Sequence, residues 1–447
     1  MEIKITKGLD LNLKGTAEPQ LLTIERPAAY AVYPADYHGL QPRLSVKEGQ
    51  HVKAGDTILT DKQTGTIHIT APVSGTIRQI ERGERRKLIA LHLQPDTIQE
   101  YREWAKPSLE TATADDIRRL LLESGLYALL RQRPYDTVPE ADSKPRAIYI
   151  STFSKMPLAA DFSYVVSGQE REFKAAVSAL AKIAKVHVGI SPEQVNTDLL
   201  PIHDAEVNIF SGPNPAGNVG VQINHTAPVN KGETVWTLGA EETIILGRLI
   251  LTGRLDLTRT IAIAGSQMKQ PAYVKVKIGA DLHTILSGQL EHTDHVRLIN
   301  GNPLVGQISS LTDHLHAHTT EICALPEGDD INEVLGWIAP RIGQHSTSRS
   351  YLSWLTPHKS YDPDCRIKGS RRHMIMSAEY ERVFPMDIYP SYLIKAIITG
   401  DIDRQEQLGI YEVAPEDFAL AEYIDSSKLE LQRIVRQGLD ILKKENA

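Results

Sequence analysis

Three histidines spaced two residues apart are the side chains in this sequence that could most directly bind a metal. His314, His316 and His318 stand in the stretch "DHLHAHTT", and on a β-strand they would share one face because strand side chains alternate. Imidazoles in such positions are ligands for zinc or copper. Three successive positions on one face form a row rather than a tetrahedron, and the nearby carboxylates of Asp313 and Glu321 would point to the opposite face. We therefore expect a solvated strand face rather than a metal site.

A lysine in a short turn could carry a covalently attached prosthetic arm. Lys62 follows Asp61 in residues 43–84, where valines and isoleucines at strand spacing are separated by glycine turns. This region resembles the flattened β-sandwich of biotinyl and lipoyl carrier domains, in which the lysine of an Asp-Lys pair at a hairpin tip is acylated. The spacing from Lys62 to "APVSG" is about two residues longer than that resemblance implies. We favour a solvated, unmodified lysine and keep a carrier module as an alternative.

A candidate ligand-binding loop follows a strand predicted at residues 206–210. The stretch "FSGPNPAGNVGVQI" combines two prolines with three glycines, so it forms a sharply shaped turn. It does not contain GxGxxG, and a dinucleotide fingerprint is therefore absent. Doubly wound sheets bind ligands beyond the carboxyl ends of their strands. Both a ligand-facing loop and a rigid connector held by its prolines remain open.

A second loop stands where a nucleotide-binding domain would place a glycine-rich turn. The stretch "ESGLYALLRQRPYDTVPEAD" follows an amphipathic helix predicted over 108–126, with Thr113 as N-cap and Gly125 at its end. It contains no glycine after Gly125. Arg131 and Arg133 could grip an anion or a lipid headgroup. We favour ion pairs with a neighbouring chain or domain, because such pairs are more common.

Strands that alternate with helices predict an α/β domain in the middle of the chain. Strands are expected at 146–151, 186–190, 206–210 and 259–265, and helices at 172–185 and 241–253. This alternation favours a doubly wound, largely parallel sheet. An alternating strand opens a small β-grasp unit over 271–310, and the chain beyond residue 386 reads as mostly helical.

The predicted fold class is a multidomain α/β chain, α+β overall. We expect a barrel-sandwich-hybrid domain at 1–105, a Rossmann-like α/β domain at 106–257, a β-grasp (SLBB-like) unit at 258–312, a mixed β/linker region at 313–378 and a helical C-terminal domain at 379–447. The chain length of 447 residues fits about two to four domains.

Composition argues against several classes of function. The net charge is −7 without a basic block, so we expect no nucleic-acid partner. The start "MEIKITKGLD" lacks the apolar region of a secretory signal, and no window is apolar enough to span a membrane. The two cysteines, Cys323 and Cys365, are too few for a zinc ribbon or a cysteine-ligated cluster, and we expect them reduced rather than disulfide-bonded. The sequence has no P-loop, nucleophile elbow or HExxH.

The order of the parts resembles that of known redox subunits. A carrier-like sandwich, an α/β domain, a β-grasp unit and a helical C-terminus are similar to the flavin- and NADH-binding subunit of respiratory complex I and, likewise, to the C subunit of Rnf complexes. The local phrases resemble the A subunits of sodium-translocating NADH:quinone oxidoreductases over essentially the whole chain: "KITKGLDLNLKG" (4–15), "APVSG" (71–75), "ESGLYALLRQRPYDTVPEAD" (123–142), "GPNPAG" (212–217), "RSYLSWL" (349–355) and "EYERVFPMDIYP" (379–390).

That resemblance implies a peripheral subunit on the cytoplasmic side of the bacterial inner membrane. Its partners would be subunits B to F, chiefly a membrane subunit, in a complex that passes electrons from NADH to ubiquinone or menaquinone and exports Na⁺. FMN, FAD, riboflavin and iron–sulfur centres would be held by other subunits. The flavin-binding relatives have a GRGGAGFP-type segment where "SGLYALLRQRPYDTVP" stands here, and cluster cysteines in the region where Ala421 and Asp425 stand. We therefore expect no cofactor on this chain.

The resemblance also leads to a hypothesis about quinone. A pocket inherited from a flavin site and lined by the loops 126–135 and 210–218 would offer the apolar walls and hydrogen-bond partners that a quinone headgroup needs. The candidate quinone-binding residues are Tyr127, Leu130, Arg131, Arg133, Gly212, Pro213, Asn214, Pro215, Ala216 and Gly217. No catalytic or metal-binding residue is assigned. The alternative is an FMN- and NADH-binding electron-transfer subunit like those of complex I or Rnf.

Overall fold

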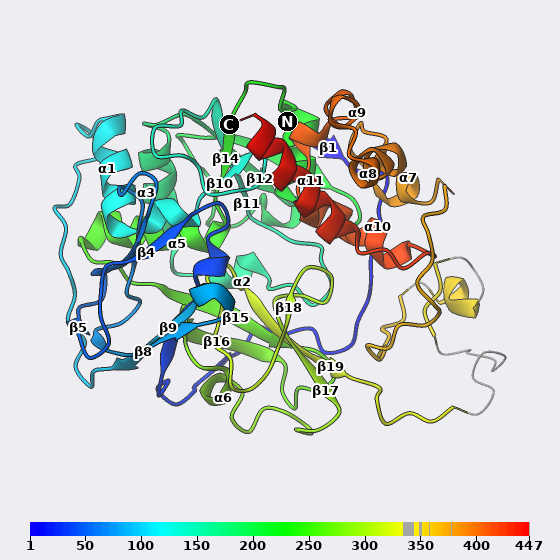
Figure 1. The fold of residues 1–447 in the computed structure, drawn as a ribbon, viewed down its shortest axis with the longest axis horizontal. Helices are drawn as coiled ribbons and strands as arrows, with labels where there is room; N and C mark the ends of the chain where they lie inside the picture. The colour runs from blue at the N-terminus through cyan, green and yellow to red at the C-terminus, as the bar shows by residue number, and fades with distance from the viewer. Residues whose placement is uncertain (334–343, 348–350, 357, 377, 447) are drawn as a thin grey trace.

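The computed structural model of the protein describes residues 1–333, 344–347, 351–356, 358–376 and 378–446. It combines a small β-sandwich, a doubly wound parallel sheet with helices on both faces, a second mixed sheet and a helical C-terminal part (Figure 1). The predicted fold class is therefore confirmed. Residues 334–343 of the expected mixed β/linker region lie outside the described ranges. None of the helices within those ranges is long and apolar enough to cross a membrane.

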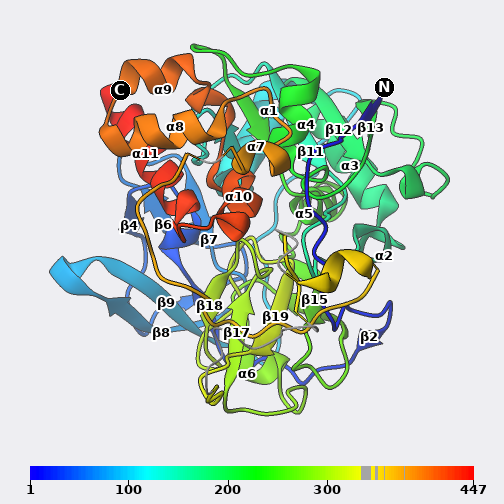
Figure 2. The same cartoon turned by 90° about the vertical axis from the view of Figure 1, so that its right-hand side faces the viewer.

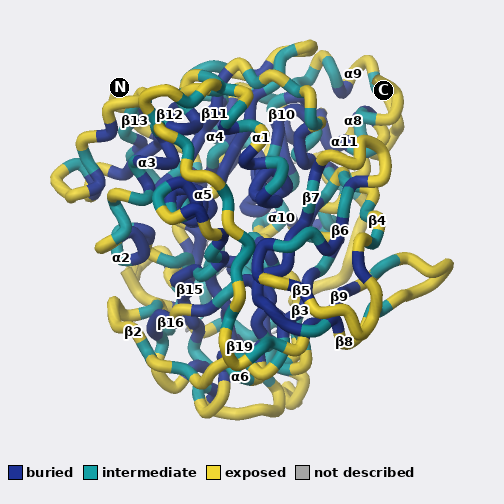
Figure 3. The backbone as a smooth tube through the Cα atoms, turned by 90° about the vertical axis from the view of Figure 1, so that its left-hand side faces the viewer, coloured by how far each residue is buried: buried dark blue, intermediate teal, exposed yellow. Residues whose placement is uncertain are grey.

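The sandwich consists of two small antiparallel sheets, ordered β3-β9-β8-β5 and β4-β6-β7. Their bounds are β3 (Tyr30–Val32), β4 (Pro42–Leu44), β5 (His51–Val52), β6 (Thr57–Asp61), β7 (His68–Thr70), β8 (Gly75–Arg82) and β9 (Leu88–Pro95). The alternating residues Val52, Ile58 and Ile77 are buried in the core, as their spacing predicts. Lys62 is exposed in the turn between β6 and β7. The β8–β9 hairpin projects from the body and ends in an exposed tip (Figure 3).

The parallel sheet has the order β1-β13-β12-β11-β14-β10. Its strands are β1 (Glu2–Lys4), β10 (Arg131–Arg133), β11 (Ala147–Ser151), β12 (Lys185–Ile190), β13 (Glu206–Ser211) and β14 (Val235–Thr237). All neighbours pair in parallel except β10, which runs antiparallel to β14 at one edge. The strand predicted at 259–265 belongs to the other large sheet.

Helices cover both faces of this sheet because successive side chains of its strands point to opposite faces and are apolar on both. Ile148 and Ile150 of β11 join the core that holds α3 (Glu170–Leu180) and α5 (Ala240–Thr252), whereas Tyr149 packs on the side of α4 (Val219–Thr226). The short α2 (Phe162–Val166) lies beside α5, and α1 (Ala114–Ser124) packs near the sandwich.

Local signals fix both ends of α1. Thr113 and Asp116 form the predicted capping box, and Gly125 ends the helix with a left-handed φ of 82°. The chain then makes the 3₁₀ turn η3 (Leu126–Leu129) and enters β10. Residues that were expected to form a loop are therefore a buried turn and an edge strand.

The second large sheet has the order β18-β17-β19-β15-β16-β2. It comprises β2 (Leu21–Leu22), β15 (Thr258–Ala264), β16 (Ala272–Lys277), β17 (Val296–Asn300), β18 (Gln307–Ser309) and β19 (Glu321–Pro326), with the short α6 (Leu282–Ile285) after β16. β19 lies between β15 and β17, so the sheet of the β-grasp unit extends beyond residue 312.

The C-terminal helices pack as a layer against the α4 side of the parallel sheet (Figure 2). They are α7 (Tyr380–Val383), α8 (Pro390–Thr399), α9 (Ile402–Gln407), α10 (Ala419–Ile424) and α11 (Leu431–Glu445). Phe384 and Phe418 share a core with Phe210 at the end of β13 and Val221 of α4. The predicted helical character of this region is confirmed.

Gly247 allows α5 to touch the backbone of α3. A methyl group on Gly247 would come within 1.7 Å of the carbonyl oxygen of Glu172. In an open helix, Gly→Ala would stabilise by about 1 kcal/mol. We expect Gly247→Ala to lower the free energy of unfolding by about 1–3 kcal/mol instead, because the two helices must separate.

Urea unfolding followed by circular dichroism measures this change. Arg171→Ala, on the exposed side of α3, is the matched control and should change stability by less than about 0.5 kcal/mol. A neutral or stabilising effect of Gly247→Ala would contradict the close contact.

Candidate functional site

A cavity of about 310 Å³ lies at the carboxyl edge of the parallel sheet. Its walls come from the residues that follow β11 and β14, from Gly217–Val219 at the start of α4 and from the first turn of α5. Asn302 and Glu321 of the second large sheet and Glu416 of the C-terminal part close the other side. Three parts of the chain thus meet at the position where doubly wound sheets bind their ligands.

The lining of this cavity has an apolar part and a polar part. Met156, Phe162, Val165, Leu238 and Val305 provide apolar walls, and Asn218, Asn302, His318 and the carboxyl groups of Glu241, Glu242, Glu321 and Glu416 provide polar ones. Asn218 is the N-cap residue of α4, but its side chain makes no capping bond. Its buried amide nitrogen has no hydrogen-bond partner among the described residues, so it is a donor available to a ligand.

Arg259 of β15 stands between two of these glutamates. Its guanidinium forms ion pairs with Glu242 and, over 3.3 Å, with Glu241. It also donates a 2.9 Å hydrogen bond to the carbonyl oxygen of Thr319. Arg259 is 1% exposed. Because both glutamates begin α5, this charge cluster ties the second large sheet to the helix layer of the parallel sheet.

The carboxyl groups of the cavity differ in their pKa values. Burial raises the pKa of Glu241 to about 7, although Arg259 opposes the shift. Burial acts on Glu242 too, but Arg259 and His318 outweigh it and lower its pKa. The pKa of Glu321 is raised, chiefly by burial. The cavity therefore places the Glu242 carboxylate, whose pKa is lowered, beside Glu241, which can hold a proton near neutral pH.

Arg133 connects β10 with the C-terminal part. It is 1% exposed and donates to Asp417 Oδ2 at 3.3 Å and to Glu416 Oε1 at 3.1 Å. The Asp417 carboxylate lies over the first turn of α4, where a methyl group on Gly220 would come within 2.5 Å of Asp417 Oδ1. A carboxylate near a helix N-terminus is favourable. Asp417 therefore occupies the position that the phosphate of a ligand would take.

The other residues predicted in the 126–135 segment do not line the cavity either. Arg131 donates to the carbonyl oxygen of Asp36 and, over 2.8 Å, to His318 Nε2, and His318 faces the cavity. Tyr127 is buried edge-on against Trp236 and donates its hydroxyl to the carbonyl oxygen of Glu140 at 2.7 Å. Leu130 is fully buried in the core.

The predicted 210–218 loop is braced by the N-terminal segment. The backbone nitrogen of Asn214 donates to Asp10 Oδ1 at 2.9 Å, and its carbonyl oxygen accepts from the backbone nitrogen of Leu9. Gly212, Pro213, Asn214, Pro215 and Ala216 do not line the cavity, whereas Gly217 does. Of the ten residues predicted for quinone binding, one therefore faces the cavity, and the arginines support residues that do.

The acidic lining of the cavity was not predicted. The pair Glu241-Glu242 follows Gly239 at a helix start, which reads as an ordinary acidic first turn. Its partner Arg259 lies in a separate strand, and nothing local in the sequence connects them. Only the apolar run that follows Arg259 in "RTIAIAG" indicated that its charge is buried.

The three histidines do not form a solvated strand face, and that expectation is wrong. Residues 313–320 form a loop with one isolated bridge, and each imidazole has its own polar neighbour. His314 lies beside the Tyr33 hydroxyl at 3.4 Å, and His316 Nδ1 lies 2.6 Å from Asp36 Oδ1. His318 accepts from Arg131. Each imidazole is at least partly buried, so its ring nitrogens need hydrogen-bond partners, and each ring lies beside a different one.

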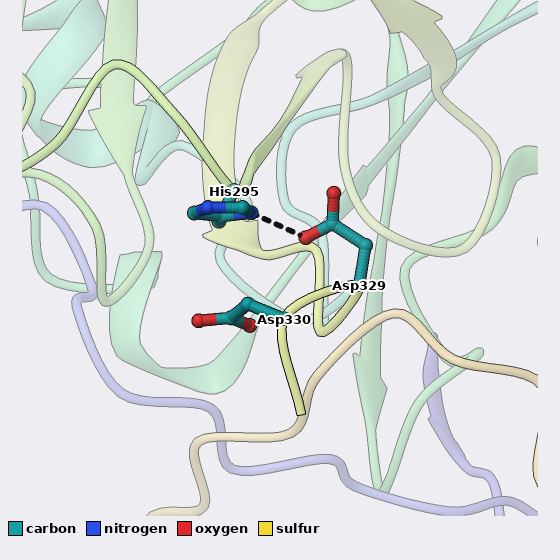
Figure 4. A group of neighbouring side chains, drawn as sticks. All are labelled: His295, Asp329 and Asp330. Carbon is teal, nitrogen blue, oxygen red and sulfur yellow. Dashed lines mark hydrogen bonds and ion pairs between the residues drawn. The ribbon is translucent and has the colours of Figure 1, made fainter. Parts of the chain in front are cut away.

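Within the part of the chain that the structure describes, one group of side chains could offer ligand atoms to a metal. His295, Asp329 and Asp330 lie on the surface with these atoms within 4.8 Å of one another (Figure 4). His295 Nδ1 is 2.8 Å from Asp329 Oδ1, and this hydrogen bond raises the pKa of His295. The hydrogen bond already engages His295 Nδ1, and all three side chains are exposed. We interpret the group as an exposed ion pair.

Models of three domains of one family match the chain. They are the NqrA N-terminal barrel-sandwich hybrid domain over residues 3–96, the NqrA second alpha/beta domain over 112–255 and the NQRA C-terminal domain over 260–310. Together the three models cover well over half of the sequence.

Several curated proteins resemble the chain over its whole length. The A subunit of the Na(+)-translocating NADH-quinone reductase from Neisseria meningitidis serogroup B is 33% identical over 99% of this chain and 100% of its own. Proteins of the same name from Pseudomonas aeruginosa and from Marinomonas sp. are also 33% identical over 99% of this chain, and the matches cover 100% and 99% of those proteins. Among solved structures, an NAD+-reducing [NiFe]-hydrogenase is 12% identical with a TM-score of 0.34, covering 49% of this chain and 48% of that one.

Removing the buried cation should destabilise the protein strongly. We expect Arg259→Met to lower the free energy of unfolding by about 3–5 kcal/mol, because Glu242 then remains buried without its partner. Arg254→Met is the matched control, since Arg254 pairs with Glu103 on the surface. Such a pair contributes at most about 1 kcal/mol. Equal losses in chemical denaturation of the two variants would contradict the assigned role.

Burial of His314 makes stability depend on pH. Burial, followed by the nearby His92, lowers the pKa of His314 to about 4, below the unfolded value of about 6.5. The unfolded chain therefore binds the proton more readily between these pH values, and the contribution of His314 is lost as pH falls from about 6.5 to 4. At pH 5 we expect wild type to lose about 1–2 kcal/mol, relative to pH 7, that His314→Phe does not lose.

Thermal unfolding of both proteins at pH 5 and pH 7 measures that difference. Exposed His203, replaced by Asn, provides the control and should keep the wild-type pH dependence. Identical pH profiles of wild type and His314→Phe would show that His314 titrates alike in the folded and unfolded chains.

Proposed function

The chain belongs to the NqrA family, whose members are the A subunits of Na(+)-translocating NADH-quinone reductases, and on that basis we propose that it serves as a peripheral subunit of such a complex. The complex couples electron transfer from NADH to ubiquinone or menaquinone with export of Na⁺. The observation that carries this proposal is similarity along the whole chain, including its C-terminal part, at 33% identity. Subunits B to F would be the partners, and this chain would lie on the cytoplasmic side.

We propose further that the chain supports the reaction without a redox cofactor of its own. Tyr127, Leu129 and Leu130 are buried in the segment where the flavin-binding relatives have bare glycine backbone. Four carboxyl groups line the cavity at the sheet edge, and carboxylates disfavour a phosphate-bearing cofactor such as FMN. Flavins and iron–sulfur centres would then belong to other subunits. The alternative of an FMN- and NADH-binding subunit is not favoured.

A neutral quinone ring suits the same cavity better than a phosphate. Its carbonyl oxygens need hydrogen-bond donors, and the amide of Asn218 and the protonated form of Glu241 are candidates for that role. Phe162 and Leu238 supply apolar wall, which a ring requires. In this proposal Arg131 and Arg133 act indirectly, because they hold His318 and Glu416 in place.

Adding back the purified chain tests its role in the complex. Membranes that contain the other subunits but lack this chain should show little Na⁺-dependent quinone reduction by NADH, and the chain should restore it. The chain alone should show no flavin band near about 450 nm, where protein does not absorb. Failure to restore activity would overturn the proposed membership, and a flavin band would favour the alternative.

A cavity-filling substitution tests the quinone site separately. Val305 lines the cavity, so we expect Val305→Trp to weaken labelling by a photoreactive quinone at least about tenfold, since a ring cannot share the space. Ile98→Trp, at an exposed position outside this cavity, should label like wild type. Labelled peptides that exclude both 151–156 and 217–219 would contradict the assignment.

A further inference from the structure

Large apolar side chains are concentrated on one side of the molecule. Half of those that are exposed among the described residues lie between Leu352 and Ile398. We use the name strap for the 3₁₀ turn η5 (Leu352–Leu355) together with residues 358–376. The strap exposes Leu352, Trp354, Leu355, Ile367, Ile375 and Met376, and the neighbouring α8 exposes Tyr392 and Ile398. Figure 2 looks onto this side, with the strap running across it below α8.

Between Tyr361 and Arg372 the backbone of the strap is hydrogen-bonded to the body at several points. Tyr361 exchanges hydrogen bonds with the backbone on either side of Leu13, and the backbone nitrogen of Cys365 donates to Pro326. Farther along, the backbone nitrogen of Arg372 donates to Ser427 at 2.8 Å. A segment held in this way presents its apolar side chains with little loss of conformational entropy on binding.

A mostly apolar cavity of about 320 Å³ opens beside the strap. Leu11, Leu13, Ile299 and Leu304 supply part of its walls, and Arg366 of the strap stands in its lining. Exposed Ile308 and Tyr423 also belong to it. This cavity is separate from the one at the edge of the parallel sheet, and its apolar walls can hold an aliphatic side chain.

The strap is basic within an acidic chain. Residues 358–376 contain five Lys or Arg and two Asp, whereas the whole chain has a net charge of −7. Arg371 pairs with Glu430 at 3.0 Å, and Arg372 is exposed next to it. Trp, Met, Ile and Arg together are typical of the cores of protein interfaces. The strap therefore complements a surface that is apolar and carries carboxylates.

We propose that the strap and α8 form a docking surface for a protein segment of another subunit. This inference rests on the proposed membership in the complex and specifies the surface that joins this chain to it. The segment would insert an aliphatic side chain into the cavity beside the strap and place Asp or Glu opposite Arg372. An anionic lipid surface fits less well, because Asp401, Asp403 and Glu406 of the adjacent α9 would be repelled by its headgroups.

Binding of the purified chain to membranes tests the docking surface. The membranes contain the other subunits but not this chain, and the apparent Kd is measured with fluorescently labelled chain. We expect the double variant Leu352→Ser/Leu355→Ser, and separately Arg372→Glu, to bind at least about tenfold more weakly than wild type. Thermal unfolding of each variant shows whether its fold is retained.

Matched variants on the sandwich provide the controls. Ile89→Ser/Ile98→Ser removes two exposed isoleucines, and Lys62→Glu reverses an exposed charge, so both should bind like wild type. Folded strap variants that bind like wild type would overturn the docking surface. Equal binding of wild type to protein-free vesicles of the same lipids would also overturn it, in favour of a lipid surface. Failure of wild type itself to bind or restore activity would instead count against the proposed function.

Discussion

A buried guanidinium is a central contact where the two large sheets of this protein meet. Arg259 leaves the second sheet and inserts between the two glutamates that begin α5, the helix beneath the parallel sheet. Removing such charges from water costs several kcal/mol per ion, and only their close approach offsets that cost. The two layers therefore have one favourable relative position. The cavity between them, with its acidic lining, is a consequence of that position.

The same edge of the sheet shows how a site can change its preferred ligand while keeping its place in the fold. Doubly wound sheets bind ligands beyond their strand carboxyl ends, and phosphates are usually held there by bare backbone amides. Here Asp417, held by Arg133, covers the first turn of α4. Carboxyl groups replace amides around the remaining space. In the quinone-site proposal, this edge of the sheet holds a neutral, hydrogen-bond-accepting molecule instead of an anion.

The sequence predicted those parts of the fold that depend on neighbouring residues. Thr113, Asp116 and Gly125 determine the ends of α1 by contacts within a few positions, and apolar periodicity located α3 and α5. Long-range pairing was not predictable in this way. β10 reads as a polar loop because its strand character comes from β14, about a hundred residues away. Charged residues are ordinarily exposed, so the burial of Arg133 and Arg259 could be recognised only with their partners in view. The prediction of a solvated histidine face was wrong for the same reason, because the alternate spacing of the histidines does not reveal their partners Tyr33 and Asp36.

The two first strands give the chain an unusual order of assembly. β1 pairs with β13, and β2 pairs with β16. Residues 2–4 and 21–22 therefore cannot pair until residues 209–211 and 273–274 have been synthesised. At ribosomal rates of about 5–20 residues per second, that delay lasts roughly 10–50 s. During this time both segments have unpaired strand edges, which are sites for wrong pairing. The leading end of the chain is consequently secured only after the strands near 209–211 and 273–274 have been synthesised.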